Sequence, residues 1–435
     1  MIKQPEKNET LAKKQVKRLE RLSLLHQSLR DFSPRSWVGF FEIGGLLTLL
    51  LTNFFLLVPF FGRPDQINVF SAPVVPVLVR LTEGIIPVQY GIRVWILSFM
   101  TLFPLSFYYL AREVSGRKLV GFIASFIAIL PVGVFLPARV NLGLLAQDGA
   151  HVVSLTLMPL ICLLLLRFLR RGNFWTGLLT AAGTTAVALT SPIGALVLAI
   201  FMGVITFSEM LLGQGRLKAL RFIVVLVLTV GFSAFWYNPR FILLTIQSSP
   251  GQILTKIFFN LLPISFFLLP LLGVFGFLLF ENRPNLQPMF IAFFLTVGFG
   301  LFSLGAGVAH PSPSRFIPAL GMALAFLTGI LMTTLFDFIR YSSKLKKFNF
   351  SKTSRHLFAL GLLAITFSLI FLVLVNYHNY LWSLEEIQVL GVATEQKVGV
   401  WEIREKIGFL ENILGVFITS LTVFGVSLLK MRLGV

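Results

Sequence analysis

Long apolar runs, separated by short polar segments, dominate the pattern of this chain. The runs are roughly 17–25 residues long, the length that a helix needs to cross about 30 Å of hydrocarbon at 1.5 Å per residue. A membrane β-barrel would instead alternate apolar and polar residues in segments of about ten. We therefore predict an all-α polytopic bundle of about twelve transmembrane helices. Their predicted bounds are 38–60, 93–111, 119–137, 152–167, 174–190, 193–212, 219–238, 259–280, 288–306, 316–337, 357–376 and 409–429.

Composition excludes a soluble globular protein. Hydrophobic residues make up 56% of the chain and charged residues 13%, whereas a soluble domain carries about 25% charged residues. A water-soluble fold could not bury this much apolar surface.

The basic residues give the bundle an orientation. With the N-terminus inside, the predicted inner segments hold 27 of the 37 Lys and Arg residues. Cytoplasmic loops carry such an excess. We therefore expect a multi-pass protein of the plasma membrane with both termini in the cytoplasm. The basic residues that give the chain its net charge of +19 are expected to contact anionic lipid headgroups. Nucleic acid is not an expected partner, because no aromatic-interleaved basic platform accompanies the charge.

Three parts follow from this pattern. Residues 1–37 form a basic cytoplasmic leader, either an amphipathic helix on the inner membrane surface or a disordered segment. Residues 38–340 form the transmembrane core. Residues 341–435 hold a basic cytoplasmic loop, two further spans and an acidic outer loop at 377–408.

Three charged residues at the predicted outer boundary are candidates for chemistry, because ionisable groups at membrane depth are costly. Asp65 is either a general base or a turn residue after Pro64. Asp148 precedes the fourth span and is either a base or cation ligand, or the cap of that helix. Arg315 precedes the tenth span and either binds phosphate or extends to the membrane interface.

Four further residues are secondary candidates for binding. His151 lies three positions after Asp148, on the same helix face, and the two could together hold a metal ion. Arg139 either binds an anion or extends to the interface. His310 is a loop residue or a ligand. Arg240 belongs either to an interfacial aromatic anchor or to a site.

Several motifs resemble those of the GT-C superfamily of membrane glycosyltransferases. Phe107–Lys118, followed by an apolar span that closes on Pro131, is similar to the second and third spans of these enzymes. The break at 190–192, Phe235–Pro239 and Ser314–Pro318 are also similar to GT-C helix ends and loops. The resemblance covers roughly residues 38–340.

The resemblance implies a GT-C-like fold and a sugar transferred from a polyprenyl-phosphate donor at the outer face. It implies Asp65 as general base, Asp148 as acceptor or metal ligand, and Arg315 as the residue that holds the lipid phosphate. A divalent cation, Mg²⁺ or Mn²⁺, would then be a cofactor. The acceptor is a glycan, a lipid or a protein. The first outer loop departs from the pattern of paired acids, because Asp65 is its single Asp.

Two other classes remain open from the sequence. One is a twelve-span transporter or lipid flippase, which the even span count favours, although such proteins place ionisable residues deep within their spans. The other is a non-catalytic accessory protein with a GT-C-like fold.

Overall fold

The computed structural model describes residues 37–61, 72–145, 148–248, 252, 273–274, 286–303, 313–341 and 403–433. Contacts divide the chain into Met1–Thr48 and Leu49–Val435, and everything below concerns the second unit unless α2 is named. All regular elements of the described residues are helical. They are α2 (Trp37–Phe61), α3 (Val74–Leu81), α4 (Val88–Ser115), α5 (Lys118–Ala128), α6 (Leu136–Val140), η1 (Asn141–Leu145), α7 (Gly149–Arg171), α8 (Phe174–Ala188), α9 (Pro192–Leu211), α10 (Gly215–Ser233), α11 (Pro239–Gln247), α13 (Gln287–Ser303), η3 (Pro313–Phe316), α14 (Ile317–Tyr341) and α18 (Phe409–Leu433).

Six of the described helices are long and apolar enough to cross a membrane. They comprise Glu42–Phe61, Tyr90–Ser115, Gly149–Arg171, Pro192–Leu211, Ile317–Asp337 and Phe409–Leu429. For the described residues, the prediction of a helical fold with helices able to span a membrane is therefore confirmed. Helices α8, α10 and α13 also lie at predicted spans. The predicted spans at 259–280 and 357–376 lie outside the described residues apart from Gly273 and Val274, so the total of twelve stays a prediction.

One predicted span is not a continuous helix. The apolar run at 119–137 forms α5, which has 11 residues and ends at Ala128. At 1.5 Å per residue it covers about 16 Å, roughly half of the hydrocarbon thickness. Pro131 follows, and Gly133 has a left-handed φ of 55°. Both residues favour a turn over a helix, although their neighbours remain apolar.

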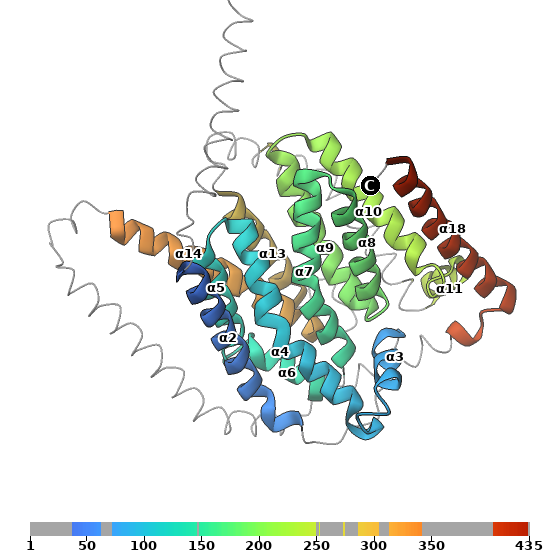
Figure 1. Cartoon of the computed structure of the whole chain (residues 1–435), viewed down its shortest axis with the longest axis horizontal. Helices are drawn as coiled ribbons and strands as arrows, with labels where there is room; N and C mark the ends of the chain where they lie inside the picture. The colour runs from blue at the N-terminus through green and yellow to red at the C-terminus, as the bar shows by residue number, and fades with distance from the viewer. Residues whose placement is uncertain are drawn as a thin grey trace, which may run out of the picture. The chain divides into compact units, whose positions relative to one another are not determined.

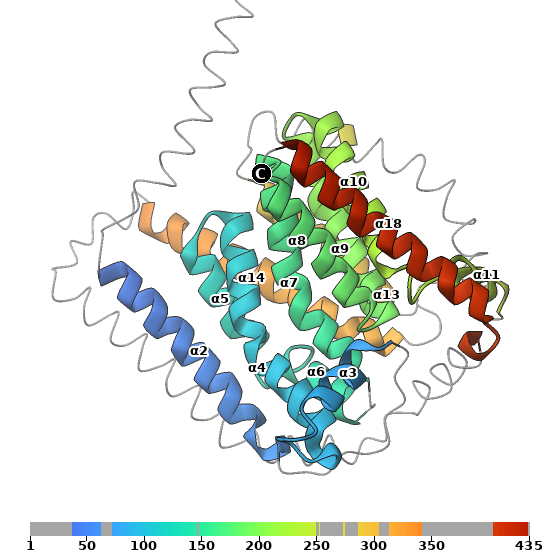
Figure 2. The same cartoon turned by 45° about the vertical axis from the view of Figure 1, so that its right-hand side comes forward.

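Helix α7 forms the centre of the bundle. It packs against α4, α8 and α9, and Figures 1 and 2 show it between α4 and α8. The membrane-length apolar stretch of α7 is 78% buried inside the protein, whereas that of α18 is 11% buried. Helix α18 packs along α10 at the periphery (Figure 1). The protein core is thus built around α7, and most of the apolar surface of α18 is exposed.

A proline in α4 is compensated by a side chain from α2. Pro104 has no N–H, so the Met100 carbonyl four residues earlier loses its helical donor. The fully buried Asn53 amide donates to the Met100 oxygen at 2.7 Å and to the Thr101 oxygen at 3.1 Å. This contact satisfies a backbone group that would otherwise be buried without a donor.

The ion pairs identify two ends of the bundle. Asp148, just before α7, pairs with Arg315, just before α14; we call this the Asp148 end. Three other ion pairs join the C-terminal ends of α4, α7, α9 and α14 and the start of α5. We call this group of helix termini the Glu209 end. These pairs are Glu113–Arg167, Glu209–Arg170 and Asp337–Arg117. Since the longest helices run from one end to the other, the two ends lie at opposite termini of membrane-length segments.

Candidate functional site

A buried ion pair marks the Asp148 end. The Arg315 Nε atom lies 3.0 Å from Asp148 Oδ2. The two side chains are 4% and 6% exposed. Arg315 sits in η3, the short 3₁₀ turn that leads into α14. The fold thus joins two of the three principal sequence candidates, which lie in distant parts of the chain.

His151 fixes the main chain of Arg315. Its Nε2 atom lies 3.0 Å from the Arg315 carbonyl oxygen, and the ring is fully buried. A carbonyl oxygen only accepts, so Nε2 carries the proton and donates. Because His151 follows Asp148 by three helical positions, one face of α7 holds both the side chain and the backbone of Arg315.

The side chain of Asp148 does not cap α7, which contradicts the capping interpretation. Asp148 is the N-cap residue of α7, but its carboxylate makes no capping hydrogen bond. Its backbone oxygen accepts instead from the amides of His151 and Val152, at 3.1 and 3.3 Å. The carboxylate instead lies against the Arg315 guanidinium, and the attraction between opposite charges is strong where both are buried.

A close helix contact sets the position of the Asp148 carboxylate. Gly149, the first residue of α7, lies against Ile96 of α4, and an added Cβ would overlap the Ile96 side chain. Glycine at this position allows α7 to start directly on α4. Asp148, one residue earlier, is thereby fixed by backbone packing as well as by its ion pair.

Arg139 has a structural role near the end of α5. Its guanidinium lies 3.7 Å from the centre of the Phe103 ring and donates to the Ala128 carbonyl oxygen. Ala128 is the last residue of α5, so the cation compensates the partial negative charge of a helix C-terminus. These contacts assign Arg139 to holding α5, while its predicted role in anion binding stays a prediction.

No contact shown links Arg240 to this ion pair. Arg240 lies 3.4 Å from Glu411 and so connects α11 to α18. Asp65 and His310 lie outside the described residues. The general base implied by the GT-C resemblance is therefore not placed.

The described residues do not by themselves assign a site for a divalent cation. They contain no group of three or more His, Cys, Asp or Glu side chains arranged to hold a metal. Of the two predicted ligands, Asp148 already faces a guanidinium, and the Nε2 atom of His151 carries a proton. Cation binding stays a prediction.

Comparison with known proteins gives no assignment: no family model, curated protein or solved structure matches the chain. What the fold defines is an all-helical protein with several helices able to span a membrane. A more specific function must be argued from the site itself.

Proposed function

We propose that this protein is a membrane glycosyltransferase of GT-C type. It would transfer a sugar from a polyprenyl-phosphate donor to an acceptor at the extracytoplasmic face. The observation that carries the proposal is the buried Asp148–Arg315 pair at one end of an apolar helical bundle. A guanidinium and a carboxylate at this end support the proposal, because a membrane-embedded donor would present its phosphate headgroup at such a boundary.

Arg315 is proposed to bind the donor phosphate. A guanidinium matches the geometry of phosphate and can bind it through two parallel N–H donors. In the transfer, the acceptor hydroxyl oxygen attacks the anomeric carbon. The bond from that carbon to the phosphate oxygen breaks, and its electron pair stays on the phosphate. Arg315 would stabilise the negative charge that develops there.

Asp148 is proposed to exchange partners when the donor binds. A carboxylate paired with a buried guanidinium can take up a proton only by giving up that ion pair. Donor phosphate would compete with Asp148 for Arg315. Once displaced, the carboxylate could orient the acceptor or receive its hydroxyl proton. Asp65 is the other proposed base, and it follows from the resemblance alone.

The pair also supports a second candidate function, a non-catalytic GT-C-like accessory protein. The Asp148 and Arg315 side chains are buried and contact each other. A contact of this kind could simply hold η3, the turn that leads into α14, against the start of α7. A transfer assay distinguishes the two candidates.

The experiment uses purified protein in proteoliposomes with a radiolabelled polyprenyl-phosphate sugar and a membrane-extract acceptor. Asp65→Asn should abolish transfer because the base is lost, and Arg315→Lys should lower it at least about tenfold because paired phosphate contacts are lost. Arg80→Gln should retain activity as the matched control, since Arg80 is exposed and pairs with Glu83 three residues away. Full activity in both the Asp65 and the Arg315 variants would overturn the proposed roles.

A further inference from the structure

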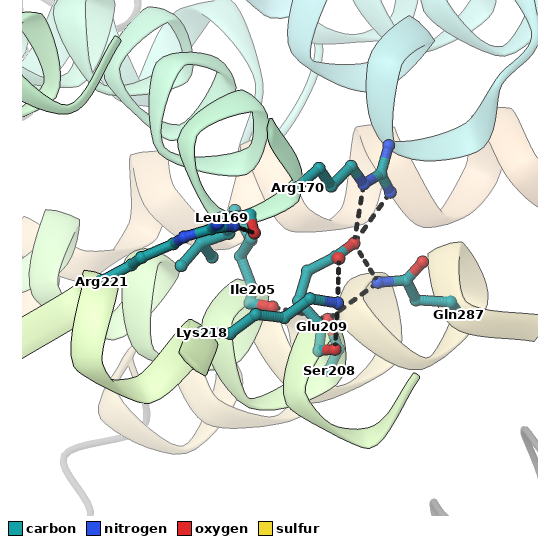
Figure 3. Close-up of polar contacts among 8 residues, drawn as sticks. All are labelled: Leu169, Arg170, Ile205, Ser208, Glu209, Lys218, Arg221 and Gln287. Carbon is teal, nitrogen blue, oxygen red and sulfur yellow. Dashed lines mark hydrogen bonds and ion pairs between the residues drawn. The ribbon is translucent and has the colours of Figure 1, made fainter. Parts of the chain in front are cut away.

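A second polar cluster lies at the Glu209 end (Figure 3). The Glu209 side chain is 1% exposed and contacts two cations. Arg170 donates to Oε1 through two nitrogens, at 3.1 and 2.8 Å, and Lys218 lies 3.0 Å from Oε2. Gln287 of α13 also donates to Oε1, at 2.8 Å. One carboxylate thus connects α7, α9, α10 and α13.

Two more arginines lie where α7 ends. Arg221 of α10 donates to the Leu169 carbonyl oxygen at 2.6 Å, and its guanidinium occupies the space beside Gly172. Gly172 has a left-handed φ of 70°, which ends the helix. Arg171, the last residue of α7, is exposed. We call Arg170, Arg171, Lys218 and Arg221 the basic corner.

The basic corner carries more positive charge than its described surroundings neutralise. Of its four cations, Arg170 and Lys218 pair with the carboxylate of Glu209, and Arg221 donates to a backbone carbonyl oxygen. The four cations and this one carboxylate together have a net charge of +3. The C-terminus of α7 and the N-terminus of α10 contribute helix-dipole charges of opposite sign, which offset each other. The other described acids of this end are Glu113 and Asp337, and they pair with Arg167 and Arg117.

The depth of the corner indicates which anion it meets. Helix α7 has 23 residues, or about 34 Å at 1.5 Å per residue. This length separates the basic corner from Asp148 by about one hydrocarbon thickness. The corner therefore lies at headgroup level when α7 spans the bilayer. Lys218 and Arg221 are three residues apart on α10, and they extend to Glu209 of α9 and to the end of α7 respectively.

From this geometry we propose that the basic corner is a binding site for the phosphate of an anionic phospholipid. The lipid would supply the negative charge that the corner lacks, at the end of the bundle opposite to the Asp148–Arg315 pair. The site does not depend on sugar transfer, and binding alone tests it.

The test measures lipid retention by the purified full-length protein in neutral detergent. Native mass spectrometry would compare phosphatidylglycerol with phosphatidylcholine as probes. The wild type should retain phosphatidylglycerol preferentially. Arg171→Gln should lower this preference about fivefold, the usual effect of one basic residue at an anionic surface. Since Arg171 is exposed, this variant should fold normally, and its thermal unfolding profile should match that of the wild type.

Arg80→Gln is the matched control, because it removes one exposed arginine from α3, at the Asp148 end. It should leave the lipid preference unchanged. An unchanged preference in Arg171→Gln, or an equal loss in Arg80→Gln, would overturn the proposal. Soluble glycerol phosphate is the third probe. If it displaces phosphatidylglycerol at equal concentration, the ligand is a free phosphate and the lipid assignment fails.

Discussion

The contact between Asp148 and Arg315 is the residue-scale feature with the largest expected effect on stability. Both side chains are buried, so neither charge can be solvated if its partner is removed. Asp148→Ala should therefore lower the free energy of unfolding by about 3–5 kcal/mol, because an uncompensated guanidinium remains inside the protein. The double variant Asp148→Ala/Arg315→Met should regain much of this loss, since replacing both charges is often close to neutral.

Tryptophan fluorescence during unfolding in mixed micelles would give the four free energies of this double-mutant cycle. The matched control is the pair Arg240–Glu411, whose side chains are 45% and 38% exposed. Its cycle should yield at most about 1 kcal/mol. Equal coupling energies for the two pairs would contradict the importance of burial at the Asp148 end.

The sequence alone predicts part of this site. The shared face of Asp148 and His151 follows from helical periodicity, which is local information. Their common partner, Arg315, lies in η3, which the tertiary fold brings to the start of α7, and no local pattern encodes that placement. The capping interpretation of Asp148 is contradicted for the same reason, since the sequence does not reveal that a guanidinium competes with the helix amides. The Glu209 network is not predicted either, because its donors come from three other helices.

At the scale of elements, the contact of α2 with α4 depends on one amide and one proline. Asn53→Leu should lower the free energy of unfolding by about 1–3 kcal/mol, because the buried Met100 carbonyl loses its donor. In the double variant Asn53→Leu/Pro104→Ala, the alanine introduced in place of proline has a backbone N–H that can bond to the Met100 carbonyl within α4. The double variant should therefore be more stable than Asn53→Leu alone.

The measurement is the unfolding midpoint of the three variants in the same micelles. Asn53→Leu paired with Pro159→Ala in α7 is the control, since Pro159 is also a proline inside a helix but lies outside the Asn53 contact. Recovery by Pro104→Ala and not by Pro159→Ala is the expected result. Equal behaviour of the two double variants would show that Asn53 does not compensate Pro104.

Element boundaries show what apolar run length can predict. Helices α4, α7 and α14 all follow from the sequence, because an uninterrupted run of about 20 apolar residues has few other stable forms in a bilayer. Helix α5 ends early although the run continues, because Pro131 and Gly133 change the backbone without changing its hydrophobicity. Counting apolar residues does not detect such a break.

At the scale of the whole molecule, charge is distributed unequally between the two ends of the bundle. The described basic residues of the Glu209 end include Arg112, Arg117, Lys118, Arg167, Arg170, Arg171, Arg216, Lys218, Arg221 and Arg340. The described acids there are Glu113, Glu209 and Asp337. Since cytoplasmic segments carry excess Lys and Arg, the Glu209 end is predicted to face the cytoplasm. The proposed transfer then takes place outside, at the Asp148 end.

Cysteine labelling tests this orientation, because Cys162, the single cysteine of the chain, is fully buried and should not react. Glu83→Cys places a thiol on the turn after α3, beside the start of α4 at the Asp148 end. Arg171→Cys places one at the Glu209 end. In intact cells a membrane-impermeant maleimide should label Glu83→Cys and spare Arg171→Cys, and permeabilisation should expose both. The wild type, with Cys162 alone, is the control for background labelling. The reverse pattern would place the Asp148–Arg315 pair on the cytoplasmic side, where its proposed donor would have to be presented from the inner leaflet.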